Sequence, residues 1–354
     1  MSEDDQSQPT VTESPDRPSK IAKITDETEK VEMAGQNPSF RSIQRYLIAI
    51  EYIGTRFSGA QQQAPNCRTV VGVLQNAFAK FIGQPVSIFC SSRTDAGVHA
   101  LSNVCHVDVE RISKRKPGEV LPPHEPSVVK KAVNHFLQKN EGDIMITDVR
   151  CVAPDFHARY KAQERTYFYR LLSGPEHLST FEKDRAWHVP EELDLLAMQK
   201  ACKVLEGLHD FSSFRASGCQ AKSPIRNLDE LNVIEVLPSP YFPSAMERET
   251  LNCSVSNGDF SCNSNQNKAA WSIGESSLGF GIRRRHRCFV VTARARSFLY
   301  HQVRFLVGAI KSVGTGELTV SDVERILEAK TVTANGPMAP AHGLYLTHVK
   351  YDLP

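Results

Sequence analysis

The stretch "SIFCSSRTDAGVHALSNVCHVDV" (87–109) decides how the first half of the chain folds. It carries two runs typical of β-strands, VSIFC (86–90) and NVCHVDV (103–109), in which apolar residues recur at alternate positions. The connection between them places Arg93 two positions before Asp95, next to a glycine. A nearby arginine can hold an aspartate ionised and oriented, but Asp and Gly are also ordinary turn residues. The pattern alone therefore allows either a reactive carboxylate or a simple turn.

The composition is that of an ordinary globular protein. Of 354 residues, 40% are hydrophobic and 23% are charged, and the length suffices for about two domains. No apolar run approaches the ~18 residues of a membrane span, so no membrane association is expected. None of the nine cysteines forms a C-x-x-C pair, which favours reduced thiols in an intracellular compartment. Metal-site histidine spacings, a P-loop and a G-x-G-x-x-G motif are also absent, so we expect neither a metal nor a cofactor.

The charge is divided between an acidic beginning and a basic remainder. Residues 1–40 hold nine Asp and Glu against four Lys and Arg, so the rest of the chain is basic although the net charge is only +2. The beginning has almost no periodic apolar content, which predicts a disordered acidic tail over 1–40. It resembles neither a transit peptide nor a signal peptide, which favours the cytoplasm or nucleus and leaves the mitochondrion possible. A basic body suits an RNA partner, and equally simple solubility.

Periodicity predicts two consecutive halves, each with strands and helices, and hence an α+β fold. The first half, 41–150, is expected to contain strand 45–54, a helix over 69–83 capped by Thr69, the two strands around the connection, a helix starting at Ser127, and strand 143–152. The second half, 151–354, is expected to contain strand 165–172, a helix over 191–207, strands 226–236 and 287–296, a helix over 297–314, a helix over 321–329 with a capping box of Ser321 and Glu324, and strand 344–353.

The second half also contains a segment of different composition. Residues 237–281 are polar and rich in Ser and Asn, and their length exceeds a normal connection, which predicts a surface insertion. A basic cluster, RRRHR (283–287), follows it. This cluster is either a phosphate-contacting patch or a solvated turn.

Two other segments combine cations with aromatic or polar residues. In "DFHARYKAQERTYFYR" (155–170) the alternation suits RNA-backbone contact and base stacking, although an edge strand with a charged face is an equal alternative. "GLHDFSSFRASGCQAKSPIRNL" (207–228) either contacts a phosphate backbone or is a solvated loop. Arg304 lies beside the apolar face of helix 297–314, where it either reaches solvent or pairs with a carboxylate such as Asp95. The candidate RNA-binding cations of the two segments are Arg159, Arg165, Arg215, Lys222 and Arg226.

Together these stretches resemble the TruA-type tRNA pseudouridine synthase family over almost the whole chain after the tail. The motifs that carry the resemblance are SRTDAGVHA (92–100), DFHARY…RTYFYR (155–170), HDFSSFRASGCQAKSPIRNL (209–228), SFLYHQVRFLVGAIKSVG (297–314) and APAHGLYLTHVKYD (339–352). The stretch SSRTDAGVHALSN (91–103) looks closest to the eukaryotic branch called tRNA pseudouridine synthase-like. The resemblance implies a mixed, mainly antiparallel sheet made from two similar halves, with helices packed on it and a central cleft. It also implies a homodimer.

The resemblance further implies the reaction and the residues that carry it. Uridine in tRNA is isomerised to pseudouridine: the N1–C1′ bond breaks and C5 joins C1′, with no atom gained or lost, so no cofactor is needed. Asp95 would be the catalytic aspartate, and it could attack C6, attack C1′ or remove the 2′ proton. Arg93 would pair with Asp95 and help to open the RNA helix, and Arg304 would form a salt bridge to it. Tyr167 would pack on the target base and assist proton removal.

Two alternatives stay open beside this interpretation. One is a pseudouridine synthase acting on mRNA or another RNA, and the other is a non-catalytic RNA-binding or chaperone protein of the same fold. The chain keeps all four residues that the resemblance assigns to the reaction, which favours an enzyme: Arg93, Asp95, Tyr167 and Arg304. The first motif, YIGTRFSGAQ (52–61), departs from the family's usual YDGTxFxGWQ at Ile53 and Ala60. This departure lies outside the catalytic set and concerns the RNA contacts of that loop.

Overall fold

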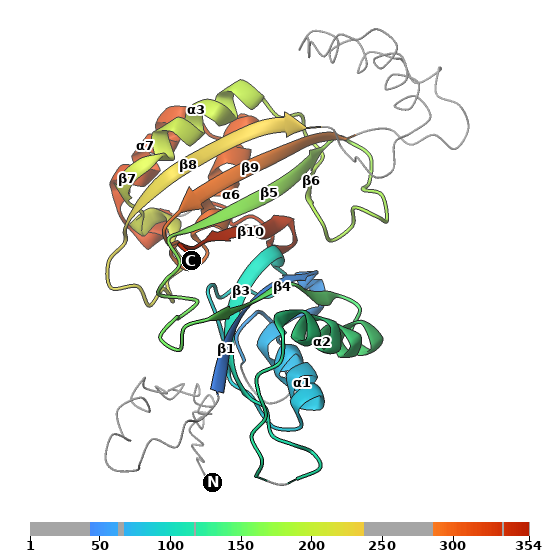
Figure 1. The fold of residues 1–354 in the computed structure, drawn as a ribbon. Coiled ribbons are helices and arrows are strands. Elements are labelled where there is room, and N and C mark those ends of the chain that lie inside the picture. The colour runs from blue at the N-terminus through green and yellow to red at the C-terminus, as the bar shows by residue number, and fades with distance from the viewer. Residues whose placement is uncertain (1–42, 63–66, 117, 237–285, 335, 354) are drawn as a thin grey trace, which may run out of the picture. The chain divides into compact units, whose positions relative to one another are not determined.

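A computed structural model describes residues 43–62, 67–116, 118–236, 286–334 and 336–353 (Figure 1). The predicted tail (1–40), the predicted insertion (237–281) and the first three arginines of the RRRHR cluster lie outside the described residues. None of the described helices is long and apolar enough to cross a membrane.

The N-terminal end of the sheet has four of the described strands, and two of the described helices pack against it. The elements are β1 (Ile43–Tyr52), α1 (Val70–Ile82), β2 (Ile88–Cys90), β3 (His99–Glu110), α2 (Pro126–Asn140) and β4 (Ile144–Val152). β1 pairs antiparallel with both β3 and β4, and β2 pairs antiparallel with β3. Tyr46, Ile48 and Ile50, which alternate along β1, are all buried, as their spacing predicts. Thr69 caps α1 as predicted, because its side chain accepts a hydrogen bond from the Gly72 amide.

Six of the described strands and three of the described helices form the C-terminal end. The elements are β5 (Glu164–Ser173), β6 (Trp187–Val189), α3 (Leu195–Leu205), β7 (Gly207–Asp210), β8 (Ile225–Val236), β9 (Arg287–Ala295), α6 (Gln302–Gly314), α7 (Val320–Ala329) and β10 (Leu344–Lys350). Short 3₁₀ turns occur at Gly54–Arg56, Ser212–Phe214, Val332–Ala334 and Ala341–Gly343. The apolar stripe of α6, which includes Leu306, Val307 and Ile310, is buried as predicted.

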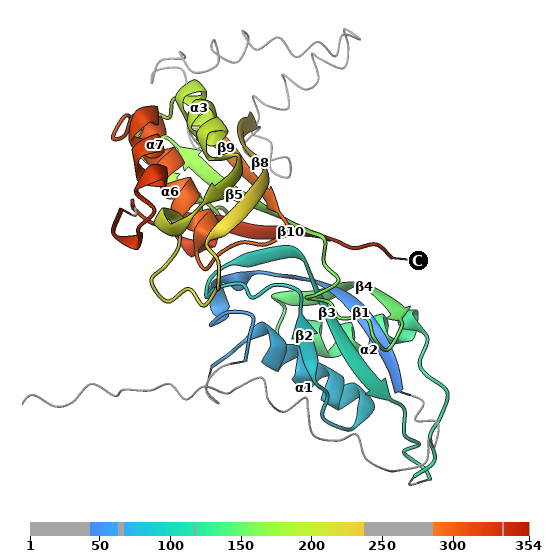
Figure 2. The same ribbon diagram turned by 90° about the vertical axis from the view of Figure 1, so that its left-hand side faces the viewer.

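All ten strands belong to one mixed sheet. Its order is β4-β1-β3-β10-β5-β9-β8-β7, with β2 added on β3 and β6 added on β5. Among the described strands, only β10 with β3 and β5 with β6 run parallel, so the predicted mainly antiparallel α+β fold is confirmed. α1 and α2 lie against the N-terminal strands, α3 and α6 lie on the C-terminal strands, and α7 packs beside α3 (Figures 1 and 2). The similarity of the two halves and the central cleft stay predictions.

The last strand joins the two ends of the sheet. β10 pairs antiparallel with β5 along its length, but pairs with β3 only through Tyr345 opposite His99 and Leu346 opposite Ala100. Buried side chains of both ends form one hydrophobic core. The first residues of β3, and the loop that precedes them, therefore lie where the N-terminal and C-terminal strands meet.

Several element boundaries differ from the predictions because side-chain caps decide them. α3 begins at Leu195 rather than 191, since Asp194 accepts a hydrogen bond from the Ala197 amide. α7 begins at Val320, and its capping box is Thr319 with Asp322 rather than Ser321 with Glu324. β3 begins at His99, inside the predicted connection, because pairing with β10 extends it. The short β6 and β7 were not predicted, since three or four residues carry too little periodicity.

Candidate active site

The loop 91–98, which joins β2 to β3, is held by the segment that follows β1. The Tyr52 hydroxyl lies 2.7 Å from the Thr94 hydroxyl oxygen, and the Ala60 amide donates to the Thr94 carbonyl at 3.0 Å. Gly97 adopts φ 81°, which favours glycine, and donates to the Phe57 carbonyl at 3.3 Å. Ala60, which the sequence analysis placed outside the catalytic set, therefore positions the loop through its backbone.

Asp95 is the acidic centre of this loop. Its Oδ2 lies 3.3 Å from Nε2 of His301 and 3.8 Å from Nη1 of Arg304, and the side chain is 22% exposed. Burial raises the pKa of Asp95 above its usual value, while His301 and Arg304 lower it in part. The contact with Arg304 matches the predicted salt bridge. An aspartate that is partly buried between two nitrogen groups is a candidate reactive residue.

Arg304 is oriented by a close approach of α6 to the segment before β10. Its Nε donates to the Ala339 carbonyl at 2.8 Å, and the Ala339 amide donates back to the Arg304 carbonyl at 3.1 Å. A Cβ added at Gly308 would lie 1.7 Å from the Pro337 carbonyl oxygen, so only glycine permits this approach. The guanidinium is therefore fixed with one edge toward Ala339 and another toward Asp95.

His301 was not among the predicted site residues. It precedes α6 with φ 61°, an uncommon left-handed conformation for a residue with a side chain. The turn is closed by Gln302, whose amide donates to the Leu299 carbonyl and whose side-chain oxygen accepts from the Leu299 amide at 2.8 Å. Three positions separate His301 from Arg304, the spacing at which side chains share a helix face. That spacing is the signal from which the sequence could have paired them.

Tyr167 lies on β5, close to the same loop. Its side chain is buried, and its ring packs edge-on against Phe298 at a centroid distance of 5.2 Å. Burial raises the pKa of the Tyr167 hydroxyl to about 12, with the Asp95 carboxylate adding to the rise and Arg165 opposing it. The phenol is therefore protonated at neutral pH, and its aromatic ring is held rigidly near Asp95.

Arg165, predicted to bind RNA, is instead buried beneath the loop. Its guanidinium donates to four oxygens: the Ser91 carbonyl, the Ser92 hydroxyl, the Arg159 carbonyl and the Arg296 carbonyl. Burial lowers the pKa of Arg165. Because its donors are occupied by the protein itself, this placement favours a positioning role over direct RNA contact.

The other predicted cations lie around the site rather than in it. Arg93, Arg159 and Lys222 are exposed, while Arg215 and Arg226 are half-buried. Arg226 donates from Nη1 to two carbonyls of its own loop, those of Ser223 and Ile225. The Ala216 amide donates to the Tyr300 carbonyl, so this loop contacts the turn before α6. Asp95 pairs with Arg304 of α6 and with His301 just before α6, and its pairing with Arg93 stays a prediction.

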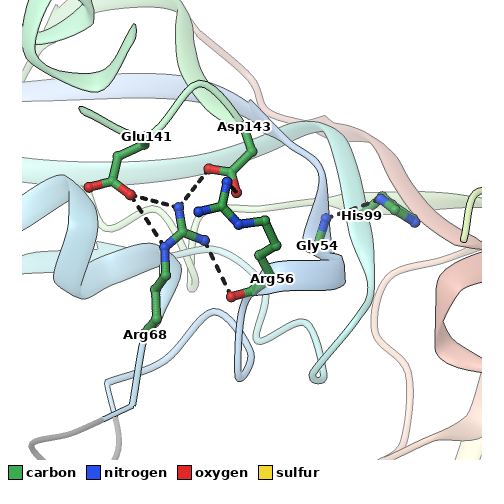
Figure 3. Close-up of polar contacts among 6 residues, drawn as sticks. All are labelled: Gly54, Arg56, Arg68, His99, Glu141 and Asp143. Atoms are coloured by element: carbon green, nitrogen blue, oxygen red, sulfur yellow. Dashed lines mark hydrogen bonds and ion pairs between the residues drawn. The ribbon is translucent and has the colours of Figure 1, made fainter. Parts of the chain in front are cut away.

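A second charged cluster anchors the segment after β1 (Figure 3). Arg68 lies 2.7 Å from carboxylate oxygens of both Glu141 and Asp143 and donates to the Arg56 carbonyl. Nearby, Nδ1 of His99 accepts a hydrogen bond from the Gly54 amide at 3.0 Å (Figure 3).

His99 is a neutral connector of this segment. Its Nε2 lies 3.1 Å from the His342 carbonyl, so Nε2 carries the proton and donates it, while Nδ1 accepts. Burial lowers the pKa of His99 to about 4, which keeps the ring in this neutral form. His99, the first residue of β3, therefore links the segment after β1 to the segment before β10. Within the described residues, no three His, Cys, Asp or Glu side chains converge as a metal site would require.

Comparison with known proteins identifies the family. A family model described as tRNA pseudouridine synthase matches residues 48–161 and 201–352, more than half of the chain. The chain belongs to the tRNA pseudouridine synthase family. It is 37% identical to tRNA pseudouridine synthase A of Rhodospirillum centenum over 309 residues, which cover 87% of this chain and 100% of that protein. It is 36% identical to the protein of the same name from Paramagnetospirillum magneticum, covering 87% of this chain and 95% of that one.

These comparisons correct one detail of the sequence analysis. A third relative, tRNA pseudouridine synthase A of Roseobacter denitrificans, is 35% identical over 88% of this chain and 96% of its own length. All three relatives are bacterial, so the comparisons do not support placing the chain nearest the eukaryotic branch. The motif SSRTDAGVHALSN, from which that placement was drawn, surrounds Asp95. The family assignment itself is confirmed.

Proposed function

We propose that this protein isomerises uridine to pseudouridine in tRNA, with Asp95 as the group that reacts with the nucleoside. The observation that carries the proposal is the placement of the Asp95 carboxylate between His301 and Arg304, on a loop fixed by backbone hydrogen bonds. Attack on C6, attack on C1′ and removal of the 2′ proton all require the ionised carboxylate. Arg304 and His301 favour that form against the effect of burial.

The surrounding residues have complementary roles in this proposal. Tyr167 packs on the target base once the uridine has left the stack, because a rigid aromatic ring replaces the stacking that the base loses. A proton acceptor must also take the proton from C5 of the uracil as C5 joins C1′, while N1 of the uracil gains a proton. His301 is a positioning residue that holds Asp95 toward the nucleoside. Arg165 fixes the loop from behind.

The RNA backbone is proposed to cross the exposed and half-buried cations, Arg93, Arg159, Arg215, Lys222 and Arg226. Such contacts position the RNA and make binding sensitive to salt. A homodimer and a cytoplasmic or nuclear location are further parts of the proposal. The bacterial relatives favour placing this chain beside the bacterial tRNA pseudouridine synthase A proteins rather than in the eukaryotic branch of the family.

The experiment compares wild type with Asp95→Asn on unmodified tRNA transcripts. Pseudouridine is mapped at single-nucleotide resolution by carbodiimide-dependent stops of reverse transcription. We expect stops with wild type and a loss of about 1,000-fold or more in rate with Asp95→Asn, which keeps the shape and removes the ionisable carboxylate. Binding of tRNA should change little, since the amide occupies the same volume.

Three outcomes separate the alternatives. Stops in mRNA or another RNA and not in tRNA would replace the proposed substrate. Tight binding of tRNA without stops would favour a non-catalytic RNA-binding protein. Equal activity of Asp95→Asn and wild type would refute the assigned role of Asp95.

A further inference from the structure

An exposed group of aromatic rings lies beside the candidate active site. Phe89 on β2 is 48% exposed and Tyr160 is 68% exposed, and half-buried His157 lies between them. We call these three residues the aromatic platform. His106 of β3, which is buried, lies beneath it. The platform combines one ring from β2 with two from the segment 155–161, which the sequence does not show to be neighbours.

The rings contact one another in a continuous series. Phe89 stacks on His106 with an interplanar angle of 15° and a centroid distance of 5.1 Å. His157 meets His106 edge-on at 4.6 Å, and Tyr160 lies against His157 at 4.3 Å. Phe89 and Tyr160 form the outer members of the series, and both keep large exposed areas. Exposed aromatic rings that are supported from below suit the stacking of a further flat group.

The backbone under the platform is fixed at four points. The Ala158 amide donates to Nδ1 of His106, and the Ala158 carbonyl accepts from the Tyr351 hydroxyl at 2.6 Å. The Phe156 carbonyl accepts from Arg45, and the Arg159 carbonyl accepts from Arg165. Because the backbone is already ordered, binding on the platform costs little conformational entropy.

The charges around the platform favour a polyanion. Arg159 is exposed, with its guanidinium 5.9 Å from the centroid of the Tyr160 ring. Lys161 is also exposed, and its Nζ lies 3.9 Å from Asp155, a loose and solvated pair that a phosphate can replace. Aromatic faces bordered by Arg and Lys are the combination that binds single-stranded nucleic acid.

The platform is connected directly to the candidate active site. Arg165 donates to the Arg159 carbonyl on one side and to the Ser91 carbonyl and Ser92 hydroxyl on the other. Ser92 lies three residues before Asp95 in the same loop. Arg165 therefore joins the backbone next to Tyr160 to the loop that carries Asp95.

We propose that the aromatic platform stacks an unpaired nucleobase of the substrate RNA, near the uridine that Asp95 modifies. This inference rests on the proposed function, since it assumes an RNA at Asp95. The stacked base is read by its flat face, so the site tolerates any base but requires it to be unpaired.

The test measures affinity and turnover separately, with unmodified tRNA transcript as the probe. Tyr160→Leu and Phe89→Leu keep an apolar side chain and remove the ring. Each should weaken tRNA binding about 5- to 100-fold, the range expected for loss of one stacked base, and leave the rate at saturating tRNA within about twofold. Tyr160→Phe keeps the ring and should bind like wild type. Phe181→Leu is the matched control, because Phe181 is 63% exposed in the connection between β5 and β6.

A second measurement detects stacking directly. In Tyr160→Trp, a base stacked on the indole should quench its fluorescence when tRNA binds. Unchanged tRNA affinity in both leucine variants, or equal weakening in Phe181→Leu, would overturn the proposal. So would a change in the sedimentation of the leucine variants with unchanged tRNA affinity, which would indicate a protein contact. Platform-dependent tRNA binding without any pseudouridine would support the platform while refuting the proposed function.

Discussion

Residues 155–161 and residues 164–170 both alternate basic with aromatic side chains, yet the structure uses them in opposite ways. In the first segment Arg159 and Tyr160 are exposed, and the Arg159 carbonyl accepts a hydrogen bond from Arg165. In the second, which belongs to β5, Arg165 and Tyr167 are each only 9% exposed. Tyr169 is fully buried and its hydroxyl donates to the Pro340 carbonyl.

The two segments differ in burial because only residues 164–170 belong to a strand inside the sheet. β5 has β10 on one side and β9 on the other, so its side chains are covered by both the core and the neighbouring loops. Residues 155–161, which precede β5, belong to none of the described strands. A similar composition therefore yields an internal clamp in one place and an exposed surface in the other. The predictions below test this division between an inner and an outer segment.

The largest effect is expected for Arg165→Lys. A single ammonium cannot reach the four oxygens that the planar guanidinium joins, so several buried acceptors lose their partner. We expect a loss of about 2–4 kcal/mol in the free energy of unfolding, measured in urea. Turnover should fall about 100-fold, because the Asp95 loop loses its support. Full stability with selectively weakened tRNA binding would instead show that Arg165 contacts RNA.

A smaller effect on turnover is expected for Arg304→Gln. The Arg304 side chain is 12% exposed. Removing the cation destabilises the Asp95 carboxylate, so the pKa of Asp95, already raised by burial, rises further. The ionised fraction is lost as pH falls through that pKa. The acid limb of the kcat/KM profile should therefore move to higher pH, and turnover at pH 7 should fall about 10- to 50-fold. A shift of this limb to lower pH would contradict the assigned ion pair.

His301→Gln provides the matched control for that experiment. Glutamine keeps a hydrogen-bond donor toward Asp95 but cannot become charged. Because His301 also lowers the pKa of Asp95, this variant should move the acid limb to higher pH as well. The hydrogen bond that glutamine keeps should make its loss of turnover smaller than that of Arg304→Gln. Comparing Arg304→Gln with His301→Gln separates the effect of Asp95 orientation on turnover from the effect of Asp95 ionisation.

The sequence predicts the elements of the fold better than their assembly. The alternation of β1, the cap at Thr69 and the apolar stripe of α6 are local patterns, and the structure confirms each of them. The pairing of β10 with β3 joins residues more than 240 positions apart, and no local pattern encodes it. The Asp95–Arg304 contact was expected from the family resemblance. The spacing links His301 to Arg304, but it does not show the left-handed turn from which His301 reaches Asp95, so His301 was missed.

The smallest effect is expected for Arg159→Gln, the outer counterpart of Arg165. Its side chain is exposed, so its loss should leave the free energy of unfolding within about 0.5 kcal/mol of wild type. If it contacts a phosphate, tRNA affinity should fall only about two- to fivefold, and the slope of log Kd against log salt should decrease by about one ion. Lys222→Gln, an exposed cation of the other loop, is the comparison for salt dependence. Stacking is not a charge interaction, so Tyr160→Leu should leave the slope of log Kd against log salt unchanged. An equal change of this slope in Arg159→Gln and Tyr160→Leu would remove the distinction between phosphate contact and base stacking on this surface.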